Sequence, residues 1–181
     1  QVKITYPVSD NPLLDANSLV PVCVATLQAD SVQLFIDDSY LASTTDESLL
    51  YGLNTSTITP GSHFLIAKAH KLSEQKTDTV VIYLRNEVLV EALPDGAQPG
   101  VNYLNGTSAT LVLSDPAAQK DFVFVLGDFN NWQVNENFYM KRTPDGNYFW
   151  ITLTNLEPQK EYAYQFYIDG NLKIADPYTH K

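Results

Sequence analysis

The residues best suited to bind a ligand lie together in the segment Gly127-Asp128-Phe129-Asn130-Asn131-Trp132. The side-chain amides of Asn130 and Asn131 each offer a hydrogen-bond donor and an acceptor, which matches the vicinal hydroxyls of a sugar. The flat indole of Trp132 can cover the apolar C–H face of a pyranose ring, because an aromatic ring presents a large apolar surface. The motif therefore predicts a sugar-binding subsite built from amides and one aromatic platform.

Pairs of carboxylates could act as a catalytic acid and base, but their positions favour solvated turns. Such a pair needs a cleft and a separation of about 5 to 9.5 Å. The candidate pairs all lie in or beside expected turns: Asp37 with Asp38, Asp46 with Glu47, and Asp121 with Asp128. We therefore predict no catalytic residue in this chain.

Metal and cofactor chemistry has little support in the sequence. His63 and His70 are seven residues apart on one expected strand, so they point to opposite faces and cannot share a metal ion. His180 lies in the C-terminal tail, and the single cysteine, Cys23, cannot form an internal disulfide. No glycine-rich phosphate loop precedes a helix. We expect no metal site and no cofactor.

The charge of the chain restricts its partners. Eleven Lys and Arg against 21 Asp and Glu give a net charge of −10 at pH 7, which repels phosphate backbones and anionic lipid headgroups. Nucleic acid and membrane surfaces are therefore poor partners. No run approaches about 18 apolar residues, so no membrane-spanning segment is expected. The chain starts at Gln1 rather than Met, which either a removed export signal or an artificial start would explain.

The elements that must position the candidate residues are strands. Helical periodicity is nearly absent, and alternation of period two recurs between turn residues. Aromatic residues make up 12% of the chain, and they suit a pleated surface. In the first half, two expected strands each bury one face; these faces carry Val20, Val22, Val24 and Thr26, and then Val32, Leu34 and Ile36.

The fold class is predicted to be all-β, with two consecutive immunoglobulin-like β-sandwiches. Residues 1–86 are expected to form the first sandwich and residues 101–181 the second. Residues 87–100, rich in Pro, Gly and acidic side chains, are expected to be a linker.

Strands in the second half place further candidate residues. In the expected strand 162–168, alternation sends Tyr162, Tyr164, Phe166 and Ile168 to the core and Gln165 with Tyr167 to the other face. Trp150 lies opposite Phe149, Ile151 and Leu153, so it is expected to face outward. It would then serve either as a second sugar platform or as a contact with the first sandwich. Asp145-Gly146 and Asp169-Gly170 predict tight hairpin turns.

Residues 93–181 resemble the immunoglobulin-like glycogen- and starch-binding module that precedes the catalytic barrel in branching enzymes, isoamylases, pullulanases and some bacterial α-amylases. Four motifs in the family's order carry the resemblance, preceded by a matching opening strand at Gly100-Val101-Asn102-Tyr103. The motifs are Gly127–Trp132, Asp145-Gly146 with Trp150, Tyr162–Gly170, and Ala175-Asp176-Pro177-Tyr178.

The resemblance implies that Trp132 stacks on a glucose ring while Asn130, Asn131 and Gln165 offer hydrogen bonds. Tyr167 and Trp150 complete the candidate set. Sugar-binding members of the family carry a second tryptophan after the later Asp-Gly turn, where this chain has Leu172. One ring covering on the order of 100 Å² gives only about 2.5 kcal/mol of gross apolar gain. An isolated site is therefore expected to bind with a dissociation constant near about 1 mM.

Residues 1–86 resemble the bacterial immunoglobulin-like domains appended to secreted polysaccharide-degrading enzymes, which implies a spacer role. The two resemblances together imply the non-catalytic N-terminal region of an exported bacterial α-amylase-family glycoside hydrolase, in the periplasm, at the cell surface or outside the cell. The expected partners are an α-glucan (starch, glycogen or a maltooligosaccharide) and the protein's own C-terminal catalytic barrel. The alternative is a purely structural tandem sandwich that contacts another protein and has no affinity for sugar.

Overall fold

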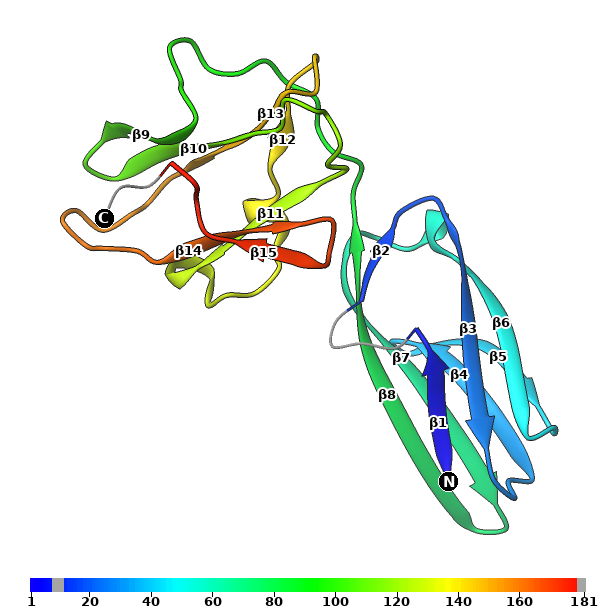
Figure 1. Cartoon of the computed structure of the whole chain (residues 1–181). Coiled ribbons are helices and arrows are strands. Elements are labelled where there is room, and N and C mark those ends of the chain that lie inside the picture. Colours follow the sequence, from blue (N-terminus) through cyan, green and yellow to red (C-terminus); the bar gives the residue numbers. More distant parts are fainter. Residues whose placement is uncertain (8–11, 179–181) are drawn as a thin grey trace. The chain divides into compact units, whose positions relative to one another are not determined.

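A computed structural model describes residues 1–7 and 12–178, and within these ranges β-strands are joined by turns and by short 3-10 helices (Figure 1). The chain divides into two compact units, residues 1–87 and 88–181, each with its own hydrophobic core. The prediction of an all-β fold is confirmed. Within the described ranges, no helix has the length and apolar character needed to cross a bilayer. His180 lies outside the described residues.

Unit 1 contains two sheets. One has the strand order β1-β3-β6 and the other β2-β8-β7-β4-β5, and all neighbours pair antiparallel except β2, which pairs parallel with β8. The strands are β1 (Val2–Tyr6), β2 (Leu13–Asp15), β3 (Leu19–Thr26), β4 (Ser31–Ile36), β5 (Ser39–Thr44), β6 (Ser48–Asn54), β7 (Gly61–Lys71) and β8 (Glu74–Arg85), with the 3-10 helix η1 (Thr55–Thr57) after β6.

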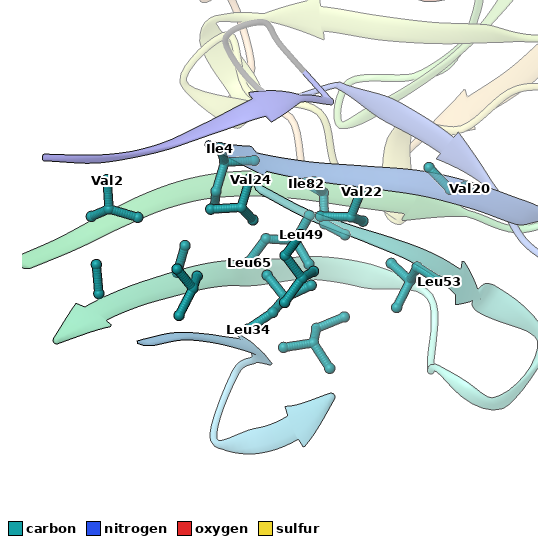
Figure 2. Close-up of a cluster of buried hydrophobic side chains, with 14 of the residues drawn as sticks. Val2, Ile4, Val20, Val22, Val24, Leu34, Leu49, Leu53, Leu65 and Ile82 are labelled. Carbon is teal, nitrogen blue, oxygen red and sulfur yellow. The ribbon is translucent and has the colours of Figure 1, made fainter. Parts of the chain in front are cut away.

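Alternating side chains from both sheets fill the core of unit 1. Figure 2 shows Val22 and Val24 of β3 on the side of the strand that faces Leu34 and Leu65, which come from the other sheet. Both faces predicted from the sequence are buried: Val20, Val22, Val24 and Thr26, and Val32, Leu34 and Ile36. The period of two is confirmed here because β3 and β4 each bury every second residue.

Unit 2 also contains two sheets, seen in the upper part of Figure 1. One has the order β12-β13-β10-β9 and the other β11-β14-β15, and all pairs are antiparallel. The strands are β9 (Gly100–Asn105), β10 (Ser108–Ser114), β11 (Val123–Gly127), β12 (Lys141–Arg142), β13 (Tyr148–Leu153), β14 (Tyr164–Ile168) and β15 (Leu172–Ile174). The 3-10 helices η2 (Asp128–Asn130) and η3 (Glu136–Phe138) follow β11.

The core of unit 2 lies between these sheets. Phe149, Ile151 and Leu153 of β13 are buried in it together with Phe166 and Ile168 of β14, as alternation predicted. At the β14–β15 hairpin, Asp169 and Gly170 have φ values of 50° and 70°. Positive φ at both central residues is the geometry that an Asp-Gly hairpin turn favours, so this predicted turn is confirmed.

The Asp176-Pro177-Tyr178 segment is tied to both sheets of unit 2. The buried carboxylate of Asp176 accepts hydrogen bonds from the Tyr164 hydroxyl at 2.5 Å and from the Tyr178 backbone amide at 2.9 Å. A Cβ atom at Gly100, the first residue of β9, would lie 2.9 Å from Cβ of Tyr178. The segment therefore closes the sandwich although it forms no strand.

The segment 87–100, expected to be a linker, is corrected by the structure. Val88 packs against the core of unit 2. Leu89 accepts a backbone hydrogen bond from Arg142 at 2.9 Å, and the Glu91 amide donates one to the Arg142 carbonyl at 2.9 Å. The sequence suggested a linker because a composition rich in proline, glycine and charge is typical of linkers, but it also suits a segment that lies on the surface of a domain.

Candidate functional site

The turn after β11 depends on a glycine. A Cβ atom at Gly127 would lie 2.6 Å from the carbonyl oxygen of Ala163 and 2.8 Å from Cζ of Phe129. Gly127 is also the cross-strand partner of Tyr164, the first residue of β14. The absence of a side chain thus lets the end of β11 lie close to the start of β14.

Asn130 holds this turn together. Its Oδ1 atom accepts a hydrogen bond from the Gly127 amide at 2.9 Å, and its Nδ2 atom donates to the Val125 carbonyl at 2.8 Å. Both polar atoms of the side chain are therefore engaged by the backbone of β11. This corrects the expectation that Asn130 offers its amide to a ligand, because side chains at turns commonly satisfy local backbone groups first.

Asn131 and Trp132 adopt the left-handed backbone conformation, with φ values of 53° and 59°. Asn tolerates this region, but for a bulky residue such as Trp it costs on the order of 1 to 3 kcal/mol. The Trp132 amide donates to the Gly127 carbonyl at 3.0 Å, and the Gln133 amide donates to the Asn130 carbonyl at 3.1 Å. These bonds keep two adjacent residues in an unfavourable conformation and direct Trp132 out of the turn.

The indole of Trp132 is exposed, with 40% of the residue accessible to solvent. Its Nε1–H group donates a hydrogen bond to Oδ1 of Asp128 at 3.0 Å, so one edge of the ring is held. Oδ2 of Asp128 accepts from the Ala163 amide at 2.8 Å. The ring of Trp132 is therefore exposed, and the Asp128 carboxylate links it to the residue that precedes β14.

Phe129 anchors the same turn to the interior of unit 2. Its ring stacks on Phe138 at a centroid distance of 5.0 Å and lies 6.2 Å from the ring of Tyr162. The side chain packs against the buried core cluster. In this turn the ring of Phe129 packs against the core of unit 2, whereas the ring of Trp132 is exposed to solvent.

Gln165 and Tyr167 project from the face of β14 that lies away from the core, as predicted. They pair across the sheet with Leu126 and Phe124 of β11. Gln165 is half-buried, and its side-chain amide makes no hydrogen bond with any residue in the described ranges. It lies two residues after Ala163, the residue held by Asp128. The structure therefore places Trp132 and Gln165 at the same end of the β11–β14 pair.

The hydroxyl of Tyr167 is less available for hydrogen bonding to a ligand than the sequence suggested. Its hydroxyl donates to the Gly170 carbonyl at 2.5 Å, and the ammonium of Lys173 lies 5.2 Å from the ring centroid. Burial raises the pKa of the Tyr167 phenol. Lys173 was not among the predicted site residues, because its position across from Tyr167 follows from the β14–β15 register.

Trp150 faces away from the core side of β13, as expected, but the expectation that it could serve as a sugar platform is wrong because its ring is buried. Trp150 is 4% exposed, its Nε1–H group donates to the Glu91 carbonyl at 3.1 Å, and the Lys141 ammonium lies 4.4 Å from its ring centroid. The ring does project away from Phe149 and Ile151, but residues of the supposed linker cover it. A buried ring cannot stack on a sugar, so Trp150 leaves the set of candidate contacts.

Asp37, one of the carboxylates considered as a catalytic acid or base, links the turn after β4 to β7. Oδ1 of Asp37 accepts from the Phe64 amide at 2.9 Å, and Oδ2 lies 2.8 Å from Nδ1 of His63. Burial alone would raise the pKa of Asp37, but these hydrogen bonds outweigh it and hold the pKa below its usual 3.8. Within the described ranges, no three His, Cys, Asp or Glu side chains lie close enough together to bind a metal ion.

Unit 2 is thus a β-sandwich that carries an exposed indole on a braced turn. Residues 99–179 match the sequence profile of carbohydrate-binding module 48 (isoamylase N-terminal domain). This match supports an immunoglobulin-like carbohydrate-binding module in that part of the chain. Because such a module binds and does not catalyse, the match also supports a non-catalytic role for these residues.

Comparison with other proteins adds no detail on function. A search of curated proteins found no match. Among solved structures, the endo-β-1,4-mannanase from Thermotoga petrophila is 14% identical, with a TM-score of 0.40 over 48% of this chain and 20% of its own. The Bacteroides uniformis β-glucuronidase 3 is 7% identical, with a TM-score of 0.41 over 97% of this chain and 24% of its own. The chain thus spans about a quarter or less of these two enzymes.

Proposed function

We propose that unit 2 binds a neutral α-glucan, such as starch, glycogen or a maltooligosaccharide, through the exposed face of Trp132. In this proposal the chain is the non-catalytic N-terminal region of an exported bacterial α-amylase-family glycoside hydrolase. Unit 1 serves as a spacer, and unit 2 also braces a catalytic barrel that follows it. The profile match over residues 99–179 supports the carbohydrate-binding part of this proposal.

The observation that carries the proposal is the exposed Trp132 on a turn with little freedom to move. An exposed aromatic residue in the left-handed conformation is costly unless the surrounding structure maintains it, and such strain concentrates at binding sites. Gln165 adds a half-buried amide at the same end of the β11–β14 pair. A platform with a neighbouring amide suits a neutral sugar, which has an apolar face and an edge of hydroxyls.

The affinity of this site should be low. A single ring that covers on the order of 100 Å² contributes about 2.5 kcal/mol of gross apolar gain, and association entropy consumes much of it. A dissociation constant near about 1 mM corresponds to about −4 kcal/mol. Such a site becomes useful when it is tethered to an active site, because the effective concentration of the sugar then replaces intrinsic affinity.

The net charge of −10 favours neutral glycans over anionic ones. A polysaccharide with uronic acid or sulfate groups would be repelled. Comparing glycogen with an anionic polysaccharide of similar size therefore tests the ligand class.

Titration with maltoheptaose, followed by NMR of the protein amides and tryptophan indoles, tests the proposed function. At about 10 mM ligand, ten times the expected dissociation constant, resonances of Trp132 and Gln165 should shift. Trp132→Ala should abolish the shifts. Tyr103→Ala is the matched control, because Tyr103 is an 83% exposed aromatic residue on β9 of the same unit, and its loss should leave binding intact.

A purely structural role is the second candidate, and a specific observation favours it. Leu172 stands where the resembling family has a second tryptophan, and Trp150 is covered, so Trp132 alone of the two tryptophans in the described ranges presents an exposed ring. Absence of any shift at about 10 mM maltoheptaose would support this role, in which Trp132 contacts another protein domain.

A further inference from the structure

We propose that Asp128 is a positioning residue, which orients the indole of Trp132 for sugar binding before the sugar arrives. This inference rests on the proposed function of unit 2. It concerns a residue whose side chain need not touch the sugar itself. Asp128 acts through its two carboxylate oxygens, which hold two different parts of the site.

The first oxygen holds the ring. Oδ1 of Asp128 accepts the hydrogen bond from Nε1 of Trp132 at 3.0 Å, and this N–H is the only polar group of the indole. The bond restrains rotation of a side chain that is 40% exposed and would otherwise sample several rotamers in solvent. It leaves both faces of the ring free of this contact, since the acceptor lies at the ring edge.

The second oxygen holds the neighbouring strand. Oδ2 of Asp128 accepts from the Ala163 amide at 2.8 Å, and the Asp128 amide donates back to the Ala163 carbonyl at 3.1 Å. Ala163 is separated from Asp128 by 35 positions along the chain and by two positions from Gln165. One carboxylate therefore sets the orientation of the platform relative to the strand that carries the candidate hydrogen-bonding amide.

Because Asp128 already holds the Trp132 side chain in the free protein, this side chain loses less conformational entropy when the sugar binds. A side chain that becomes immobilised only on binding weakens affinity by about two- to twelvefold relative to one already held. Removal of the Asp128 carboxylate should produce a loss of this size. A role confined to folding would instead change stability and leave the affinity of the folded protein unchanged.

Three substitutions separate these roles. Asp128→Ala removes both links, and Asp128→Asn keeps the size of the side chain with one acceptor oxygen in case the Ala variant does not fold. Replacement of Trp132 by 3-benzothienylalanine exchanges the N–H for sulfur, so it removes only the link to the ring and retains the stacking face. Asp145→Ala is the matched control, because Asp145 braces a hairpin of the same unit through Thr143 and Asn147 without contacting an indole.

The experiment measures maltoheptaose affinity by NMR titration, together with the order parameter of each indole N–H, in the full chain. With Asp128→Ala, affinity should fall about two- to twelvefold, and the Trp132 order parameter should fall toward values of flexible groups, below about 0.6. Trp150, whose indole donates to the Glu91 carbonyl, should stay rigid and serves as the internal reference. Asp145→Ala should change neither quantity.

Several results would overturn the inference. If the wild-type chain binds but Asp128→Ala binds equally well, or its Trp132 indole stays rigid, Asp128 does not position the ring and the proposed function survives. If Asp128→Ala weakens binding as much in the benzothienylalanine background as in the wild type, Asp128 acts only through Ala163. If the wild-type chain itself fails to bind, both the proposed function and this inference are wrong.

Discussion

Asn130→Ala should destabilise unit 2 strongly, because Asn130 supports the turn that presents Trp132. The side chain accepts from the Gly127 amide at 2.9 Å and donates to the Val125 carbonyl at 2.8 Å, and both of these residues are buried. Truncation would remove both hydrogen bonds and leave a donor and an acceptor without partners in the interior.

The magnitude follows from these two groups. A buried polar group that loses its partner costs about 1 to 3 kcal/mol. With some access for water at the turn, we expect a loss of about 2 to 4 kcal/mol for the pair. For a domain the size of unit 2, residues 88–181, this corresponds to a decrease in Tm of about 10 to 20 °C.

Urea denaturation followed by tryptophan fluorescence measures this loss. The chain has two tryptophans, Trp132 and Trp150, and both lie in unit 2, so the signal reports the unfolding of that unit. Asn171→Ala provides the control, because Asn171 is exposed and its side chain makes no hydrogen bond with another residue of the described ranges; it should cost less than about 0.5 kcal/mol. A loss below about 0.5 kcal/mol for Asn130→Ala would refute the assignment of Asn130 as the support of the turn.

Three further predictions concern the cover of Trp150, the ligand site and the acid limb of stability. Trp150→Ala should lower the free energy of unfolding by about 3 to 5 kcal/mol, because it empties the space under Glu91 and Lys141; urea denaturation checks this. Leu172→Trp should strengthen maltoheptaose binding by about tenfold, because position 172 is 51% exposed and a second ring would add apolar contact; an unchanged dissociation constant in the NMR titration would contradict this. Burial alone would raise the pKa of Asp115, but hydrogen bonds from the Lys120 ammonium and amide outweigh it and hold the pKa below 3.8. The contribution of the Asp115 carboxylate to the free energy of unfolding is therefore complete above about pH 3.8 and is lost as the pH falls through the folded-state pKa. Asp115→Asn should therefore reduce the loss of stability at acidic pH, which a pH–stability profile measures.

Local patterns were sufficient to predict several of the strands and the exposure of Trp132. The period of two in Val20, Val22 and Val24 places these residues on one face in any pleated strand, and the core of unit 1 uses that face. The Asp169-Gly170 turn follows from the positive φ angles that these residue types accept. The polar surroundings of Trp132 in the sequence likewise indicated an exposed ring.

The roles of Asn130, Asp128 and Trp150 depended on contacts that the sequence does not display. The sequence motif alone suggested that Asn130 binds sugar, but the backbone of β11 passes within hydrogen-bonding distance of both its polar atoms. For Asp128, the sequence favoured a solvated position in a turn over a role as acid or base, and it could not show the contact with Ala163, which is 35 positions away.

For Trp150, alternation correctly separated the ring from the core face of β13, but it could not show that Glu91 lies against the ring on the opposite face. The spacing of two along a strand determines which side chains share a face, because it is a property of the local backbone. Whether that face meets solvent or another segment depends on where Glu91 packs, 59 positions from Trp150, and only the folded chain decides it.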